Sequence, residues 1–259
     1  MSRIIALTNQ KGGVGKTTTC INLAASLART KRKVMLIDLD PQGNATTGSG
    51  ILRDQVEHSI YDVLLGEKTL LEVAQETSGN FTLIPSESGL AGAQAELNDV
   101  PNRDHILKQA LTVVNDQYDF VLIDCPPALN VLTVNALVAA DSVLIPVQCE
   151  YYALEGLSGL LETIGKIRQA YNPELAIEGL LRTMYDGRNS LANEVSDQLH
   201  EHFGDKVFRT LIPRNVRLAE APSYGKAVIE YDMHCTGSQS YLALAGELLR
   251  KIEEQFNGS

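Results

Sequence analysis

The most constraining feature of this sequence is a turn rich in glycine and lysine that joins an apolar run to a helical pattern. The apolar run covers Arg3 to Thr8, the turn reads N-Q-K-G-G-V-G-K-T-T over residues 9–18, and the helical pattern covers Lys16 to Arg29. Glycines let the backbone curl so that several N–H groups point at one anion, and the following helix adds the positive end of its dipole. This context predicts a phosphate-binding loop.

Within this turn, Lys16 is expected to reach the β- and γ-phosphates of a nucleotide, and the Thr17 hydroxyl is expected to bind Mg²⁺. The standard motif G-x-x-x-x-G-K-[ST] fails, because Gln10 stands where its first glycine belongs. A glycine-rich turn with a solvated lysine at each end is the alternative interpretation. The residues assigned to ATP binding in the loop are Lys11, Gly12, Gly13, Val14, Gly15, Lys16, Thr17 and Thr18.

The rest of the chain alternates apolar runs with helical patterns, which predicts an α/β fold with a doubly wound, mostly parallel sheet and helices on both faces. With 259 residues and 44% hydrophobic content, one P-loop domain over residues 1–259 is the simplest organisation. The predicted strands are Arg3 to Thr8, Lys33 to Asp38, Phe81 to Pro85, Phe120 to Asp124, Ser142 to Val147, Ala176 to Met184 and Val207 to Ile212. The predicted helices are Lys16 to Arg29, Asp104 to Asn115, Asn130 to Ala139, Ala153 to Ala170, Leu191 to His202 and Gln239 to Phe256. We expect Gly43 to Asn80 to be a mobile excursion.

Two of the predicted strands end in aspartates. The first leads into D-L-D-P-Q-G-N, with Asp38 and Asp40, and the second leads into Asp124 after four apolar residues. Ligands bind at the carboxyl ends of strands in open α/β sheets, and alternation places Asp38 and Asp40 on one side of an extended segment. Asp124 follows the Walker B layout, beside a metal. Turn formation or helix capping is the alternative role of such aspartates.

The string K-G-G-V-G-K-T-T, with its second lysine at Lys11, resembles the deviant Walker A motif of the ParA/MinD family of P-loop ATPases. The resemblance implies an ATPase that uses ATP and Mg²⁺, with Lys11, Lys16 and Asp40 as its catalytic residues. Asp40 would position the attacking water, while Thr17, Asp38 and Asp124 would lie around the metal. It also implies a homodimer in the ATP-bound state, in which Lys11 reaches the phosphates of the other subunit.

The segment from Ile212 to Ser223 resembles a second signature of this family, in which Pro213 and Asn215 hold the adenine. From the residues alone, this stretch reads as a strand end and a turn. Residues 206–228 also carry five basic residues and one acid, a net charge of +4 in a chain of net charge −10. A solvated face is one explanation. The resemblance to the chromosome-partitioning branch implies instead non-specific contacts to double-stranded DNA at Arg188, Arg217 and Lys226, and a ParB-like partner that stimulates hydrolysis.

Three other members of this fold class have visible discriminators. A MinD-like ATPase that positions itself on membranes ends in a basic amphipathic helix, but here the charges opposite the apolar stripe nearly cancel, so no membrane contact is expected. A nitrogenase-reductase-like protein needs cluster-binding cysteines, and Cys125 is the candidate. A small-molecule ligase such as a dethiobiotin-synthetase relative is disfavoured by the resemblance of residues 146–156 to partition proteins.

The remaining expectations from the sequence concern the state of the cysteines, the location of the protein in the cell, an added domain and one loop. The four cysteines lie far apart without a C-x-x-C pair, which indicates reduced thiols rather than a zinc site. No apolar run of 18 residues and no signal-peptide pattern is present, so we expect a soluble cytoplasmic protein associated with the nucleoid. Since the phosphate loop begins within the first dozen residues, we expect the short form without an added DNA-binding domain. After Tyr231 and Asp232 the relatives are expected to continue with a proline and a basic residue, whereas this chain continues with Met233 to Thr236.

Overall fold

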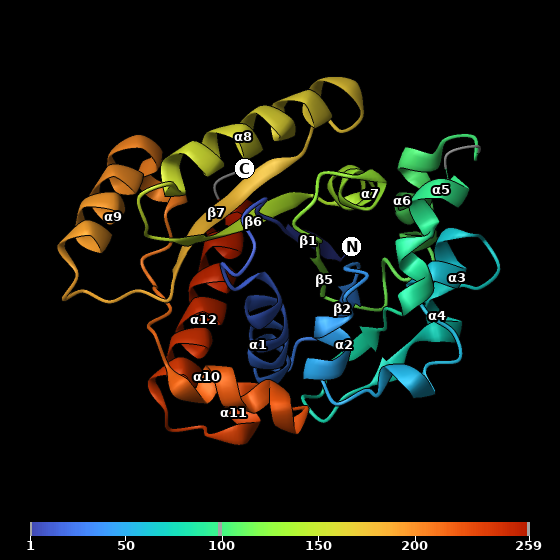
Figure 1. Cartoon of the computed structure of the whole chain (residues 1–259), viewed down its shortest axis with the longest axis horizontal. Helices are drawn as coiled ribbons and strands as arrows, with labels where there is room; N and C mark the ends of the chain where they lie inside the picture. Colours follow the sequence, from blue (N-terminus) through green and yellow to red (C-terminus); the bar gives the residue numbers. More distant parts are fainter. Residues whose placement is uncertain (1, 98–99, 258–259) are drawn as a thin grey trace.

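A computed structural model describes residues 2–97 and 100–257, and its centre is a seven-stranded sheet with the order β3-β4-β2-β5-β1-β6-β7 (Figure 1). The inner strands pair in parallel, and β3 pairs antiparallel with β4 at one edge. The strands are β1 (Arg3–Leu7), β2 (Val34–Asp38), β3 (Gln75–Glu76), β4 (Thr82–Ile84), β5 (Phe120–Asp124), β6 (Ser142–Gln148) and β7 (Ala176–Thr183). The prediction of a mostly parallel α/β sheet is confirmed.

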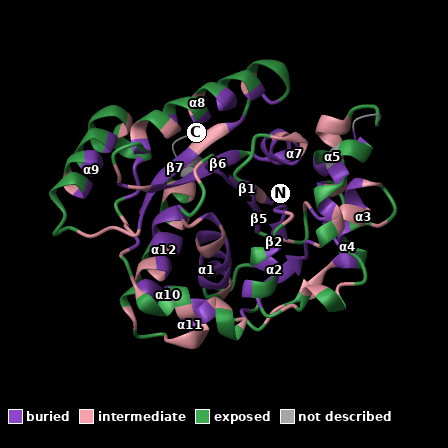
Figure 2. Ribbon diagram, viewed as in Figure 1, coloured by how far each residue is buried: buried purple, intermediate pink, exposed green. Residues whose placement is uncertain are grey.

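Helices cover both faces of the sheet, so that strands such as β2 and β5 are buried on both sides (Figure 2). In β1, Ile5 and Leu7 belong to one core cluster with α1 and α12, whereas Ala6 belongs to the other with α6, α7 and α8. The helices are α1 (Lys16–Arg29), α2 (Asn44–Gly48), α3 (Ile60–Leu64), α4 (Leu70–Val73), α5 (Ala93–Glu96), α6 (Ile106–Leu111), α7 (Val131–Ala139), α8 (Ala153–Ala170), α9 (Ser190–Phe203), α10 (Val216–Glu220), α11 (Val228–Tyr231) and α12 (Thr236–Asn257).

The predicted strand from Val207 to Ile212 is wrong. The segment forms an isolated bridge between Leu180 and Val207, and its residues 208 and 212 donate backbone hydrogen bonds to β7, but side chains take the backbone groups between them that a strand ladder needs. The Glu247 carboxylate accepts from the N–H groups of residues 209 and 210 at 2.7 and 2.8 Å. The Arg182 guanidinium donates to the carbonyls of residues 208 and 209. The segment therefore runs beside β7 without extending the sheet.

The segment from Gly43 to Asn80, expected to be a mobile excursion, contains regular elements that pack into the core. It contains the short helices α2, α3 and α4 and the edge strand β3. Ile60, Leu64 and Leu70 are almost completely buried in the main core. The Ser59 side chain begins α3 with a capping box, in which the Asp62 carboxylate accepts from the Ser59 N–H at 2.7 Å. Pairs of apolar residues in short helices gave too weak a period to be recognised.

The last helix, α12, packs onto the body of the fold, as its mixed charges indicate. Leu244 and Leu248 are completely buried, and Leu249 and Ile252 pack against the same cluster. The Phe256 side chain, assigned to the same stripe, lies outside the described residues. Over residues 2–97 and 100–257, no helix combines the length and apolar character needed to span a bilayer.

Candidate nucleotide-binding site

A pocket of about 690 Å³ lies at the carboxyl end of the central strands. The structure brings the phosphate loop, Asp40 and the predicted adenine residues Pro213 and Asn215 together in its wall. The loop residues in the wall are Gly12, Gly13, Gly15, Lys16, Thr17 and Thr18. Val14 is buried instead, and its carbonyl accepts from the Thr183 hydroxyl at 2.8 Å. Its predicted role is therefore limited to its backbone.

The loop adopts the backbone conformation that its glycines allow. Gly13 and Gly15 have φ values of +74° and +87°, and a Cβ on Gly13 would meet no atom within 4 Å. This space lets a ligand approach the backbone closely. Lys16 begins α1 and is 7% exposed, and its burial lowers the pKa of its ammonium although Asp124 and Asp40 partly oppose the effect. A cation held in this position favours an anionic ligand.

Lys11 does not belong to the pocket wall. Its ammonium Nζ lies 2.7 Å from Oε2 of Glu150, which follows β6, and both side chains are partly exposed. The Lys11 carbonyl instead faces the pocket lysine and accepts from Lys16 Nζ at 3.3 Å. The two lysines of the loop thus point to different partners, and of the two only Lys16 lines the pocket of its own chain.

Asp38 is a fully buried carboxylate at the end of β2. Its Oδ2 accepts from both the N–H and the hydroxyl of Thr46 at 2.7 Å, and its Oδ1 accepts from the N–H of Asp40 at 3.3 Å. Burial raises the pKa of Asp38 to about 6, while the Thr46 hydrogen bonds oppose that shift. These donors take up much of the acceptor capacity of the carboxylate, which agrees with the contact through water that the family resemblance implies.

Asp124 is directly beside Asp38, since the two are paired in the register of the neighbouring strands β2 and β5. It is completely buried, and within the described residues neither carboxylate oxygen has a hydrogen bond of good geometry, although the Thr17 hydroxyl and the Cys20 thiol lie close to it. Burial raises the pKa of Asp124 to about 8, and Asp38 adds to the shift, whereas the nearby Thr17 hydroxyl lowers it. A buried carboxylate without a partner is costly, and a bound cation would relieve that cost.

These residues fit Mg²⁺ of the kind that nucleotides carry. Among the described residues there is no group of three or more His, Cys, Asp or Glu side chains that could hold a metal unaided. Mg²⁺ prefers few protein ligands, usually one or two carboxylates, and completes its shell with waters and phosphate oxygens. The unpartnered Asp124 carboxylate beside the Thr17 hydroxyl supplies this partial set of oxygen ligands.

Asp40 lies in the pocket wall and is 8% exposed. Its Oδ1 accepts from the N–H of Gln42 at 3.0 Å, and its carbonyl accepts from the Ser86 hydroxyl at 2.8 Å. These bonds fix the backbone and one oxygen of the carboxylate and direct the side chain into the pocket. Such an orientation suits a group that positions a water molecule.

The pocket wall also includes residues that the sequence does not predict as site residues, besides Pro213 and Asn215, which are predicted to hold the adenine. Asn215 lines the wall, but its side chain also caps α10 by accepting from the Leu218 N–H at 3.3 Å, and it donates to Thr236. The missed wall residues include Gln42, Asn44, Thr183, Met184, Arg214 and Tyr241. Gln42 and Asn44 lie within four residues after Asp40, Thr183 ends β7 and Met184 follows it, at strand ends where ligand contacts are predicted. No local signal points to Tyr241 on α12.

The structure divides the basic cluster of residues 206–228. Arg214 lines the nucleotide pocket, whereas Lys206 and Arg209 line a separate polar pocket with Glu247. Of the three predicted DNA contacts, Arg188 pairs with Asp186 at 2.7 Å, and Arg217 pairs with Glu220 at 2.8 Å and with Asp232 at 3.4 Å. Lys226 is exposed. DNA phosphates would have to replace these carboxylates.

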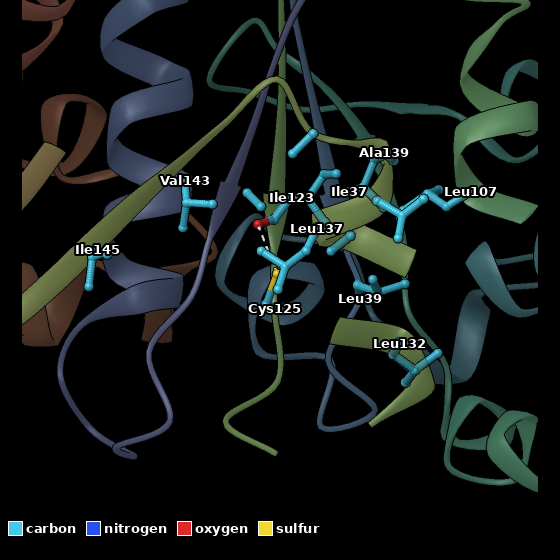
Figure 3. Close-up of a cluster of buried hydrophobic side chains, with 14 of the residues drawn as sticks. Ile37, Leu39, Leu107, Ile123, Cys125, Leu132, Leu137, Ala139, Val143 and Ile145 are labelled. Atoms are coloured by element: carbon cyan, nitrogen blue, oxygen red, sulfur yellow. Dashed lines mark hydrogen bonds between the residues drawn. The ribbon is translucent and has the colours of Figure 1, made fainter. Parts of the chain in front are cut away.

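Cys125 is unsuited to an exposed iron–sulfur site. Its side chain is completely buried in the core cluster shown in Figure 3, next to Ile123 and Leu137, and burial raises the pKa of its thiol. Cys20, Cys125 and Cys149 are buried, Cys235 is partly buried, and all four are free thiols. The expectation of reduced thiols agrees with this arrangement.

Comparison with known proteins places this pocket in a family. A family model described as AAA domain matches residues 2–177. The chain is 51% identical over 256 residues to the chromosome partitioning protein ParA of Caulobacter vibrioides, covering 98% of this chain and 96% of the relative. It is 51% identical over 249 residues to the sporulation initiation inhibitor protein Soj of Bacillus subtilis, covering 96% and 98%.

Among solved structures, the fold matches cobyrinic acid a,c-diamide synthase of Mycobacterium smegmatis, determined with a bound ATP analogue and magnesium. The TM-score is 0.86 at 36% identity, covering 98% of this chain and 96% of the other. With its deviant phosphate loop, its two acidic strand ends and these relatives, the chain belongs to the ParA/MinD family of P-loop ATPases.

Proposed function

We propose that this chain is a chromosome-partitioning ATPase that binds ATP with Mg²⁺, dimerises and then binds DNA without sequence preference. ATP hydrolysis is slow in the chain alone and is stimulated by a ParB-like partner. Hydrolysis causes the dimer to dissociate and to release the DNA. The 51% identity to proteins named for chromosome partitioning supports this proposal over nearly the whole chain. Under this proposal the protein acts in the cytoplasm, at the nucleoid.

The observation that carries the proposal is the different orientation of the two loop lysines. Lys16 lies in the pocket, but the Lys11 ammonium lies outside it, paired with Glu150 at 2.7 Å and partly exposed. A single chain therefore leaves one cation of its phosphate loop unused by its own nucleotide. Transfer of Lys11 to the nucleotide of a second copy would complete both sites, as an arginine finger completes the sites of other P-loop enzymes.

Hydrolysis in this site depends on positioning and charge neutralisation rather than on a strong base. Bound Mg²⁺ would neutralise charge on the phosphate oxygens, held by Thr17 and Asp124. Lys16 would bind the β- and γ-phosphates, and Asp40 would orient the attacking water. Pro213 and Asn215 line the part of the pocket proposed for the adenine.

DNA binding is assigned to Arg188, Arg217 and Lys226, all exposed to solvent. Contacts of this kind are made to phosphates, read no sequence and weaken steeply with salt because counterions are released. A dimer presents two copies of each contact, so dimerisation raises DNA affinity without refolding. ATP would in this way control attachment to DNA.

A second candidate function is suggested by the synthase in the structural comparison. This enzyme has the same fold, and its name describes a reaction on a small molecule. Fold likeness alone does not decide between them. The identity to this enzyme is 36%, compared with 51% for the partition proteins, which favours partition. The MinD-like membrane alternative is disfavoured by the burial of Leu244 and Leu248 in α12.

The test is retention of the full chain on immobilised double-stranded DNA with ATP, ADP or no nucleotide, repeated on vesicles of anionic phospholipid. We expect retention on DNA with ATP alone, and no retention on vesicles. ATP-dependent vesicle binding without DNA binding would support the MinD-like alternative. Hydrolysis without binding to either surface would favour a small-molecule enzyme.

A further inference from the structure

The short helix α2 is attached to the end of β2 and the residues after it, through the Asp38 carboxylate and the Asp40 backbone carbonyl. Thr46, in the middle of α2, donates both its N–H and its hydroxyl to Asp38 Oδ2 at 2.7 Å. At the start of the helix, the N–H of Gly43 donates to the Asp40 carbonyl at 2.9 Å. Asn44, the first residue of α2, lines the nucleotide pocket. A displacement of the Asp38 to Asp40 segment therefore displaces α2.

Just beyond α2, the backbone at Gly50 lies directly against the backbone at Gly225. Both residues have positive φ, +89° and +63°. A Cβ on Gly225 would lie 2.5 Å from the Gly50 Cα, and a Cβ on Gly50 would lie 2.8 Å from the Gly225 carbonyl oxygen. Only glycine at both positions permits such a close approach. No side chain lies between the two backbones to absorb a movement.

Gly225 lies in the segment that carries two of the proposed DNA contacts. Its neighbour Lys226 follows directly, and the 3₁₀ turn η6 (Ala221–Tyr224) connects it to α10, which contains Arg217. The turn is closed by the Lys226 N–H, which donates to the Ala221 carbonyl at 3.2 Å. On its other side, the segment is held by α1, since the Asn22 side chain accepts from the Val228 N–H at 2.7 Å.

We propose that the contact between Gly50 and Gly225 couples the nucleotide site to the DNA-binding segment. A change at Asp38 and Asp40 would pass through α2 to Gly50, and from there to the turn that carries Lys226. The inference rests on the proposed function, because it requires DNA binding that depends on the nucleotide. Gly50 and Gly225 are positioning residues, since neither lines the nucleotide pocket.

The variant Gly225→Ala tests the coupling, and Gly66→Ala is its matched control. Gly66 also has a positive φ, +78°, but a Cβ there would meet no atom within 4 Å, so the control carries backbone strain without a clash. The measurement is the affinity for a fluorescent DNA duplex with ATP and with ADP, together with ATP affinity and dimerisation. In Gly225→Ala we expect the ratio of the two DNA affinities to fall at least about fivefold, while ATP affinity changes less than about twofold.

The control should keep the wild-type ratio. A Gly225→Ala protein that folds and keeps the ratio overturns the coupling, as does an equal loss in Gly66→Ala. If Gly225→Ala does not fold, amide hydrogen exchange of the wild type decides: ATP, compared with ADP, should alter exchange in residues 221–228, and unchanged exchange overturns the coupling. If the DNA affinity of the wild-type protein is the same with ATP and with ADP, the proposed function itself is contradicted.

Discussion

The side chain of Asp124 is an unusual feature at the scale of single residues, because it is completely buried and makes no hydrogen bond of good geometry within the described residues, and such a carboxylate destabilises a fold. Since its pKa is raised to about 8, the folded chain retains a proton that the unfolded chain releases near pH 4. Between these values the folded state binds more protons, so stability must fall as the pH rises. This penalty disappears when a cation is bound.

The variant Asp124→Asn should therefore show a shallower loss of stability between about pH 4 and pH 8 than the wild type, by up to a few kcal/mol, without nucleotide or metal. Urea unfolding at several pH values in the presence of a chelator measures this. Asp38, whose pKa is raised to about 6, should leave a residual slope at the acidic end. The exposed Asp54→Asn serves as the control. Equal slopes in wild type and Asp124→Asn would contradict the prediction.

The pocket position of Asp40 gives a second prediction at this scale. Because the carboxylate is assigned to the water and not to nucleotide binding, Asp40→Ala should bind ATP within a few-fold of wild type but hydrolyse it at least ~100-fold more slowly. The variant should accumulate as an ATP-bound dimer that stays on DNA. Nucleotide binding and single-turnover hydrolysis are the measurements. Loss of ATP binding would contradict the role given to Asp40.

At the scale of elements, α12 shows how the charge pattern of a helix predicts its surroundings. Its apolar stripe meets α1 in the core, where the Tyr241 hydroxyl lies 3.1 Å from that of Thr19. A helix held in this way is a structural element, and it is unavailable to lie on lipid. The segment from Val207 to Ile212 behaves differently, because its apolar pattern is typical of a strand but the segment does not form one.

Shortening a side chain in the apolar stripe of α12 tests whether this helix packs on the fold or is free to contact a membrane. Leu248→Ala should destabilise the fold by about 2–5 kcal/mol, because it leaves a cavity in a closely packed core. The exposed Glu253→Ala, on the other side of the helix, should change stability by less than about 0.5 kcal/mol. Denaturant unfolding measures both. A small effect of Leu248→Ala would indicate a loosely attached helix and revive the membrane alternative.

At the scale of the whole molecule, the net charge of −10 makes DNA binding a local property. Arg188 and Arg217 are both paired with acids, so the isolated chain presents little free positive charge at these positions. Exposed ion pairs contribute little energy and are readily exchanged for phosphate. This arrangement suits weak, reversible and salt-sensitive attachment.

Changing Arg188 and Arg217 together to Glu should abolish retention on DNA at physiological salt, while dimerisation with ATP persists. The control is the same change of charge at Lys108 and Lys166, exposed on α6 and α8, which should retain DNA binding. DNA retention and sedimentation with ATP are the measurements. Unchanged retention in the double arginine variant would move the DNA surface elsewhere.

The sequence by itself determined the sheet class, most strand positions, the longer helices, and the turn predicted to bind phosphate. These depend on local patterns, namely the spacing of apolar residues and the order of glycine, lysine and aspartate along a few turns of chain. The acidic strand ends Asp38 and Asp124 were predictable for the same reason, since parallel strands bring their carboxyl ends to one edge.

The tertiary structure alone decided where side chains from distant segments meet. It paired Lys11 with Glu150, left Asp124 without a hydrogen bond of good geometry within the described residues, and brought Gly50 against Gly225. It also let Arg182 and Glu247 take the backbone groups of a segment that has the pattern of a strand. No local sequence pattern predicts these contacts, because they form between residues that are far apart in the chain. Such residues compete for the same backbone groups, charges and space. The outcome of this competition is decided only when the whole fold packs.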